Sequence, residues 1–93
     1  MRLRYSAAAR SQLDDIGDYI AQHDPVAAQQ VLWRIRAAAE RLRRFPYMGR
    51  SGREPGTFEW PVRGLPYIIV YEVFVDDEDE VMVLNVFHGA QDR

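Results

Sequence analysis

The short stretch HDPVAA, which separates two amphipathic helix patterns, constrains the fold more than any other feature of the sequence. The first pattern extends from Ala7 to about His23, and the second from Pro25 to about Arg44. Asp24 can cap the second helix, and proline suits the first helical position because its missing N–H has no partner there. The apolar positions form one stripe on each helix: Ala9, Leu13, Ile16 and Ile20 on the first, and Ala28, Val31, Leu32, Ile35, Ala38, Ala39 and Leu42 on the second. A joint this short predicts an antiparallel helical hairpin.

The sequence on either side of the hairpin predicts strands that can form its packing partner. Residues 1–5 alternate between apolar and basic side chains, as in a half-buried strand. The run YIIVYEVFV, Tyr67–Val75, is apolar on nearly both faces, which is typical of a central strand. Thr57–Arg63 and Val81–Phe87 complete the set, and Pro61 indicates that the former is an edge or bulged strand. This order predicts an α+β fold, strand–helix–helix–three strands, in which the helical hairpin covers one face of a small, mostly antiparallel sheet.

Composition limits the class of protein. With 93 residues, 47% of them hydrophobic and 28% charged, the chain is expected to form a single globular domain over residues 1–93. Without cysteine it can form neither a disulfide nor a cysteine zinc site. The two histidines and the acidic run at 76–80 lack metal-site spacing, and no phosphate-binding glycine loop is present, so no metal and no cofactor are predicted. The sequence has no apolar run near the ~20 residues of a membrane span and no signal peptide, which predicts a soluble, cytoplasmic protein without membrane contact.

Charge is strongly segregated along the chain. From Arg34 to Arg63 there are eight arginines and three glutamates, a balance of +5. From Gly64 to Arg93 there are seven acidic residues and one arginine, a balance of −6, and the chain contains no lysine. Arginine binds carboxylate and phosphate groups in a planar, bidentate way. The basic segment therefore fits a partner that carries either group, an acidic protein included, or is simply a solvated helix face.

Two hypotheses about function follow from the residues. In the first, the open face of the sheet is an active site, in which His88 transfers a proton at neutral pH. Arg63, assisted by Arg50 or Arg53, would hold a phosphate there. In the second, the chain is a binding module that docks onto other proteins through the hairpin arginines and Trp33.

A structural interpretation of His88 is open as well. Counted along the last strand, the histidine has the same parity as Met82, Leu84 and Val86, and so shares an apolar face with them. It also stands beside Gly89, where the strand ends and commonly frays. On spacing alone, this interpretation is favoured over a catalytic one.

The sequence resembles the ParE/RelE superfamily of toxins from bacterial type II toxin–antitoxin modules. The similarity is carried by FPYMGRSGREPGTFEWPVRGLPYIIVYEV and VLNVFHGAQDR, and it covers essentially the whole chain. The fold of that family has the element order predicted above. RelE-like members cut messenger RNA in the ribosomal A site, whereas ParE-like members poison DNA gyrase. A cognate antitoxin holds both kinds inactive.

The resemblance also bears on the catalytic hypothesis. Arg63 falls close to an arginine that RelE-like nucleases place before the GLPY-type turn, and His88 falls near a histidine that some nucleases carry. Gln91 and Ile68 stand where nuclease members have arginine, and the lysines of the lysine-dependent nucleases are missing. These are losses of groups that would stabilise developing phosphate charge.

The resemblance thus implies a ParE-like toxin that forms a hetero-oligomer with its antitoxin and arrests growth by binding DNA gyrase. The alternative is a ribosome-dependent endonuclease that acts on messenger RNA through His88 and Arg63. The residues predicted to bind the antitoxin are Val31, Trp33, Arg36, Arg43 and Arg44. Those predicted to bind the target are Gly89, Ala90, Gln91, Asp92 and Arg93.

Overall fold

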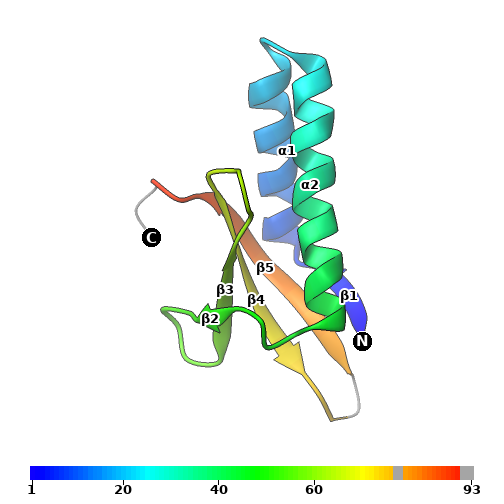
Figure 1. Cartoon of the computed structure of the whole chain (residues 1–93), viewed down its shortest axis with the longest axis vertical. Helices are drawn as coiled ribbons and strands as arrows, with labels where there is room; N and C mark the ends of the chain where they lie inside the picture. Colours follow the sequence, from blue (N-terminus) through cyan, green and yellow to red (C-terminus); the bar gives the residue numbers. More distant parts are fainter. Residues whose placement is uncertain (77–78, 91–93) are drawn as a thin grey trace.

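The computed structural model of the chain describes residues 1–76 and 79–90, and it confirms the predicted α+β fold (Figure 1). The elements are β1 (Arg2–Tyr5), α1 (Ala7–Ala21), α2 (Pro25–Arg44), β2 (Arg50–Ser51), β3 (Thr57–Pro61), β4 (Tyr67–Phe74) and β5 (Glu80–His88). The two helices run side by side, and their joint extends beyond the end of the sheet. They pack on one face of the sheet, as the apolar stripes predicted.

Both helices begin at the caps that their sequences supply. Ser6 Oγ accepts a hydrogen bond from the Ala9 N–H at 3.0 Å and donates one to the Leu84 carbonyl oxygen at 2.7 Å, which ties the start of α1 to β5. Asp24 Oδ1 accepts from the Ala27 N–H at 3.0 Å. Side-chain caps satisfy N–H groups that have no partner inside the helix. Ser6 and Asp24 therefore give the two helices a defined start.

The predicted stripes form the core. Ala9 and Leu13 of α1 are buried, as are four residues of α2: Ala28, Ile35, Ala39 and Leu42. They meet the buried strand residues Ile69, Tyr71, Val81, Val83 and Val86. The helices approach closely at Gly17, which the stripe did not include: a Cβ atom there would lie 2.9 Å from Leu32 Cδ1.

The strand order is β1-β5-β4-β3-β2, with β1 parallel to β5 and every other pair antiparallel. The central position of β4 confirms its sequence interpretation. The edge assignment of Thr57–Arg63 is wrong, because the two-residue strand β2 pairs with β3 outside it. Pro61 is tolerated as the last residue of β3 because β2 pairs only with Phe58 and Glu59, so no ladder bond is needed at the proline.

A register shift changes which face of the sheet β5 presents. Val70 pairs with Asn85 and Tyr71 pairs with Val83, so Leu84 is an extra residue in a β-bulge. Val83 before the bulge and Val86 after it therefore both face the helices. The predicted shared face of His88 with Met82 and Leu84 is wrong for this reason. His88 lies on the helix side of the sheet with Val81, Val83 and Val86, so Val86 alone of the three predicted neighbours shares its face.

Candidate partner-binding surfaces

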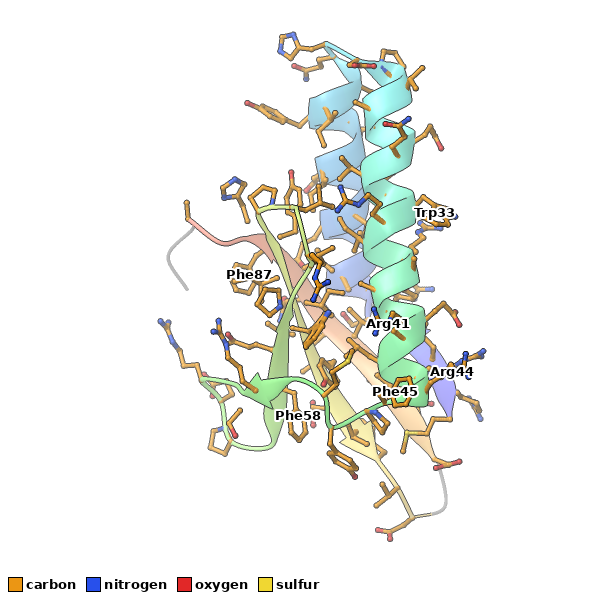
Figure 2. The ribbon with its side chains drawn as sticks, in the orientation of Figure 1. Trp33, Arg41, Arg44, Phe45, Phe58 and Phe87 are labelled. Carbon is orange, nitrogen blue, oxygen red and sulfur yellow. The ribbon has the colours of Figure 1, made fainter. Side chains whose placement is uncertain are left out.

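The first candidate surface lies on the side of α2 turned away from the sheet and on the loop that follows it. We call it the α2 surface and define it by Trp33, Arg41, Arg44, Phe45 and Tyr47. Figure 2 shows Trp33 projecting outward from the middle of the helix, with Arg41, Arg44 and Phe45 near its end. Trp33 is 71% exposed, and eleven residues, about three helical turns, separate it from Arg44. An indole and guanidinium groups on one side of a helix are the side chains that most often dominate binding energy in protein interfaces.

The end of α2 opens into a shallow hollow of about 610 Å³. Its lining combines two guanidinium groups with apolar and aromatic side chains: Arg41, Arg44, Phe45, Pro46, Tyr47 and Met48. Phe45 is 55% and Tyr47 61% exposed. Two large aromatic rings left in water beside cations are typical of a surface that a partner covers.

Buried Tyr71 fixes the loop that carries these rings. Its phenol oxygen accepts a hydrogen bond from the Gly49 N–H at 3.0 Å and donates one to the Pro46 carbonyl oxygen at 2.8 Å. Phe58 stacks on Tyr71 with centroids 5.5 Å apart, and Tyr47 meets Phe58 edge-on at 5.7 Å. The exposed aromatic rings are therefore held in place before a partner binds, which lowers the ordering cost of association.

The five residues predicted to bind the antitoxin do not share one face. Trp33, Arg36 and Arg44 are exposed, whereas Val31 is partly buried against the core. Arg43 forms an exposed ion pair with Glu40 at 3.2 Å. Their roles as contacts stay predictions.

Arg36 lies on the flank of α2 next to β1. Burial raises the pKa of Tyr5 in that strand, and the positive charge of Arg36 opposes the rise. Sequence reasoning missed Arg41, Phe45 and Tyr47, although the letters RRFPY placed apolar rings in a loop, which is a signal of exposure.

The second candidate surface is the open face of the sheet, opposite the helices. Alternation and pairing place on it Arg2, Arg4, Arg50, Glu59, Ile68, Val70, Glu72, Met82 and Phe87, with Glu80 at one corner. Glu80 is only 4% exposed and forms ion pairs with Arg2 at 3.6 Å and Arg4 at 3.8 Å. Glu59, also 4% exposed, pairs with Arg50 at 3.6 Å. The strand arginines of this face thus neutralise carboxylates, and Ile68, Val70, Met82 and Phe87 supply apolar side chains beside Glu72.

The structure separates the two predicted catalytic residues from that face. Arg63 lies exposed in the turn between β3 and β4, where its carbonyl oxygen accepts a hydrogen bond from the Arg34 guanidinium. His88 ends β5 and meets Tyr67 edge-on, with centroids 5.6 Å apart. The Ala90 N–H donates to His88 Nδ1 at 3.1 Å, so this nitrogen acts as a hydrogen-bond acceptor. The lone pair that a general base would use is engaged by the backbone.

A cleft of about 490 Å³ separates α1 from the ends of β4 and β5. We call it the His88 cleft; it is lined by Gln12, Asp15, Ile16, Tyr19, Tyr67, Val86, Phe87 and His88. Burial raises the pKa of Tyr67, and the nearby Tyr19 phenol raises it further. The lining thus combines aromatic rings with one carboxylate.

The predicted target-binding tail is described only in part. Gly89 and Ala90 are exposed, and the Gly89 N–H donates to the Pro66 carbonyl oxygen at 2.6 Å. Gln91, Asp92 and Arg93 lie outside the described residues. Within residues 1–76 and 79–90, no three histidine or acidic side chains converge as metal ligands would, and neither helix has the length and apolarity to cross a membrane.

The sequence matches the family model described as ParE toxin of type II toxin–antitoxin system, parDE, over residues 3–93. The protein named "Putative toxin Y4kP" of Sinorhizobium fredii (strain NBRC 101917 / NGR234) is 40% identical over 90 residues, which cover 97% of this chain and 90% of that protein. Toxin RelE2 of Caulobacter vibrioides is 34% identical over 83 residues, 89% of each chain. In fold, the chain is similar to one from the chromosomal ParDE TA system of P. aeruginosa, with a TM-score of 0.82, 22% identity and 95% of each chain covered.

Proposed function

The chain belongs to the ParE toxin family of type II toxin–antitoxin systems, and we propose that it arrests growth by binding DNA gyrase, without bond-breaking chemistry of its own. As the toxin of such a module it has an antitoxin partner. The gyrase step is carried over from the ParE-like branch that the sequence resembles. The proposed place of action is the cytoplasm, where gyrase and the antitoxin would meet the toxin.

The observation that carries this proposal is the state of the arginines on the open face of the sheet. A nuclease stabilises phosphate charge with cations aimed at the reacting group. Arg2 and Arg4 instead flank buried Glu80, and Arg50 flanks buried Glu59. The positive charge of these arginines is thus largely offset by the two carboxylates, and the apolar side chains of the face offer no hydrogen bond to an RNA backbone. Such a face favours contact with a protein over catalysis on RNA.

The α2 surface is the proposed docking site of the antitoxin. Its exposed guanidinium groups favour acidic side chains, which would steer association, while Trp33, Phe45 and Tyr47 offer apolar area for an amphipathic segment. The expected product is a hetero-oligomer of toxin and antitoxin.

One observation favours the second candidate, a ribosome-dependent endonuclease of messenger RNA. Tyr67 pairs with His88 across β4 and β5, and Arg63 stands in the turn just before β4. The two predicted catalytic residues therefore lie at the same end of the sheet. An exposed arginine near a histidine is the minimum that acid–base cleavage of a phosphodiester would require.

Two assays on the purified toxin separate the candidates. In the first, gyrase supercoils relaxed plasmid in the presence of increasing toxin; in the second, ribosomes translate a defined messenger whose 5′ ends are mapped afterwards. We expect supercoiling to be inhibited in proportion to bound toxin and the messenger to stay intact. Codon-spaced cuts in the messenger, with normal supercoiling, would replace the proposal by the endonuclease.

A further inference from the structure

We propose that the His88 cleft accepts a guanidinium or ammonium group presented by the protein target. This inference rests on the proposed function, because a protein target can insert an arginine or lysine side chain, whereas an RNA target would present phosphates. The cleft lies between two elements that are firmly joined, so its walls exist before any partner arrives.

The helix wall of the cleft is built from one face of α1. Gln12, Asp15 and Tyr19 recur at the three- and four-residue spacing of a single helix face. Gln12 is held in place at the edge of β5: its Oε1 accepts from the Val86 N–H at 2.7 Å and its Nε2 donates to Asn85 Oδ1 at 3.1 Å. This wall therefore presents a carboxylate and a phenol, while one N–H of the Gln12 amide is bound to Asn85.

The strand wall is aromatic. Tyr67 and His88 are directly paired across β4 and β5, and their rings meet at 82° with centroids 5.6 Å apart. The phenol of Tyr67 stays neutral because burial and the neighbouring Tyr19 phenol raise its pKa. The imidazole ring is held in place, since its Nδ1 accepts a hydrogen bond from the Ala90 N–H at 3.1 Å. Neutral rings attract a cation through their negative faces.

The carboxylate and the aromatic rings of the lining together favour a positively charged ligand. Asp15 supplies a carboxylate to the described lining, which includes neither arginine nor lysine. Asp14 and Asp18 are exposed on the same helix, so the surroundings are also acidic. A phosphate would meet the Asp15 carboxylate on the helix wall, which would repel it. A guanidinium or ammonium group would meet a carboxylate and aromatic rings, which is the usual environment of a bound cation.

The position of the cleft assigns the cation to the target, not to the antitoxin. The α2 surface is basic and favours an acidic partner, whereas the His88 cleft has the opposite preference and is built on the other helix. Its strand wall includes His88, which directly precedes Gly89 and Ala90, the described part of the predicted target-binding tail. Two surfaces of opposite preference suit two different partners.

The binding chemistry can be tested without any partner. The probe is N-acetyl-arginine amide, added to ¹⁵N-labelled toxin, with N-acetyl-citrulline amide as the neutral isostere. We expect saturable shifts of the amide signals of Asp15, Tyr67 and His88 with the arginine probe only. The Asp15→Asn variant should lose these shifts, while Asp14→Asn, a matched change on the same helix outside the lining, should keep them. Equal shifts with citrulline, or none with arginine, would overturn the inference.

A supercoiling assay with the same variants tests the assignment to the target. Asp15→Asn should need about tenfold more toxin than wild type for equal gyrase inhibition, and Asp14→Asn less than about twofold more. If Asp15→Asn inhibits as well as wild type, the cleft does not hold the target and the inference fails while the proposed function stands. If wild-type toxin does not inhibit gyrase at all, the proposed function fails, and the arginine probe alone decides whether the cleft binds cations.

Discussion

The α2 surface and the open face of the sheet both carry arginines, but their surroundings differ. On the open face, Arg2, Arg4 and Arg50 lie beside carboxylates that are almost completely buried. On the α2 surface, Arg41 and Arg44 border a hollow between exposed aromatic rings. The same side chain therefore stabilises the fold in one region and is available to a partner in the other. Sequence counts of charge cannot make this distinction, because it depends on which residues are paired across strands.

The largest effect is expected on the rate of antitoxin association when arginines of α2 are replaced. Reversing Arg36, Arg43 and Arg44 to glutamate should slow antitoxin association about a hundredfold at low salt, because the field that steers an acidic partner changes sign. Stopped-flow mixing measures the on-rate. The difference should shrink at about 0.5 M salt, where charges are screened within a few ångströms.

Arg10→Glu provides the control for this charge reversal, since Arg10 is exposed on α1 and not on α2. It should change the on-rate by less than about threefold. An on-rate that the triple reversal leaves unchanged would show that the α2 arginines are solvated and unused.

Removing arginines from the open face should instead cost stability. The double variant Arg2→Gln/Arg4→Gln leaves the carboxylate of Glu80 buried without a cation, and we expect the free energy of unfolding to fall by about 2 kcal/mol. Arg41→Gln/Arg44→Gln is the matched change on the α2 surface and should cost less than about 0.5 kcal/mol. Urea unfolding followed by circular dichroism measures both. Equal losses in the two regions would remove the contrast between them.

The order of the loop under the α2 surface depends on Tyr71. Tyr71→Phe removes the partner of the Gly49 N–H and of the Pro46 carbonyl oxygen, which should lower the free energy of unfolding by about 1.5 kcal/mol at neutral pH. Tyr47→Phe is the matched control, because its ring is exposed and should be replaceable at little cost.

The same tyrosine gives the fold an alkaline limit. Burial raises the pKa of Tyr71 above the ordinary value of about 10, with the Gly49 hydrogen bond opposing the rise. In the unfolded chain the phenol ionises first, so the native state binds more protons above about pH 10 and stability falls as pH rises. Between pH 9 and pH 11, the free energy of unfolding measured in urea should fall more steeply with pH for wild type than for Tyr71→Phe. The chain contains no lysine, so no lysine titrates in this range. Identical slopes would count against this account.

A smaller effect is expected at the exposed indole. Trp33→Ala should weaken antitoxin affinity about fivefold, mainly through faster dissociation, because the indole supplies apolar contact area without a charge. The free energy of unfolding should stay within about 0.5 kcal/mol, since the side chain is largely in water. The dissociation rate of the toxin is measured from antitoxin that is attached to a sensor surface. An unchanged rate would remove Trp33 from the α2 surface.

The helical hairpin and central strand could be predicted because their signals are local. Asp24 and Pro25 define the joint, and the stripes at helical spacing identify the buried faces. β2 could not be predicted, because two residues in a loop rich in glycine have no periodicity. The bulge at Leu84 could not be predicted, because apolar residues occupy both the odd and the even positions of EVMVLNVFH. A one-residue slip there reverses the face of every later residue, which is why His88 was assigned to the wrong side.

The candidate site was predicted less completely than the fold. Trp33 and Arg44 were predicted from the sequence as partner contacts on the second helix, and both are exposed. Arg41, Phe45 and Tyr47 were missed because only the path of the loop, fixed by buried Tyr71, shows that they gather around one hollow. The pairing of Arg50 with Glu59 could not be predicted either, because it depends on strand β2, which the sequence did not indicate.

The most direct test of the central claim, that this toxin binds its target without cleaving RNA, is growth arrest by the double variant Arg63→Ala/His88→Phe. Phenylalanine keeps a ring in the cleft but cannot transfer a proton, and alanine removes the exposed guanidinium. Induced in cells with a separately controlled antitoxin, the variant should arrest growth at an expression level within about threefold of wild type, since no catalytic group has been lost. Normal growth of those cells, with the variant folded and still bound by antitoxin, would contradict the account and identify an enzyme.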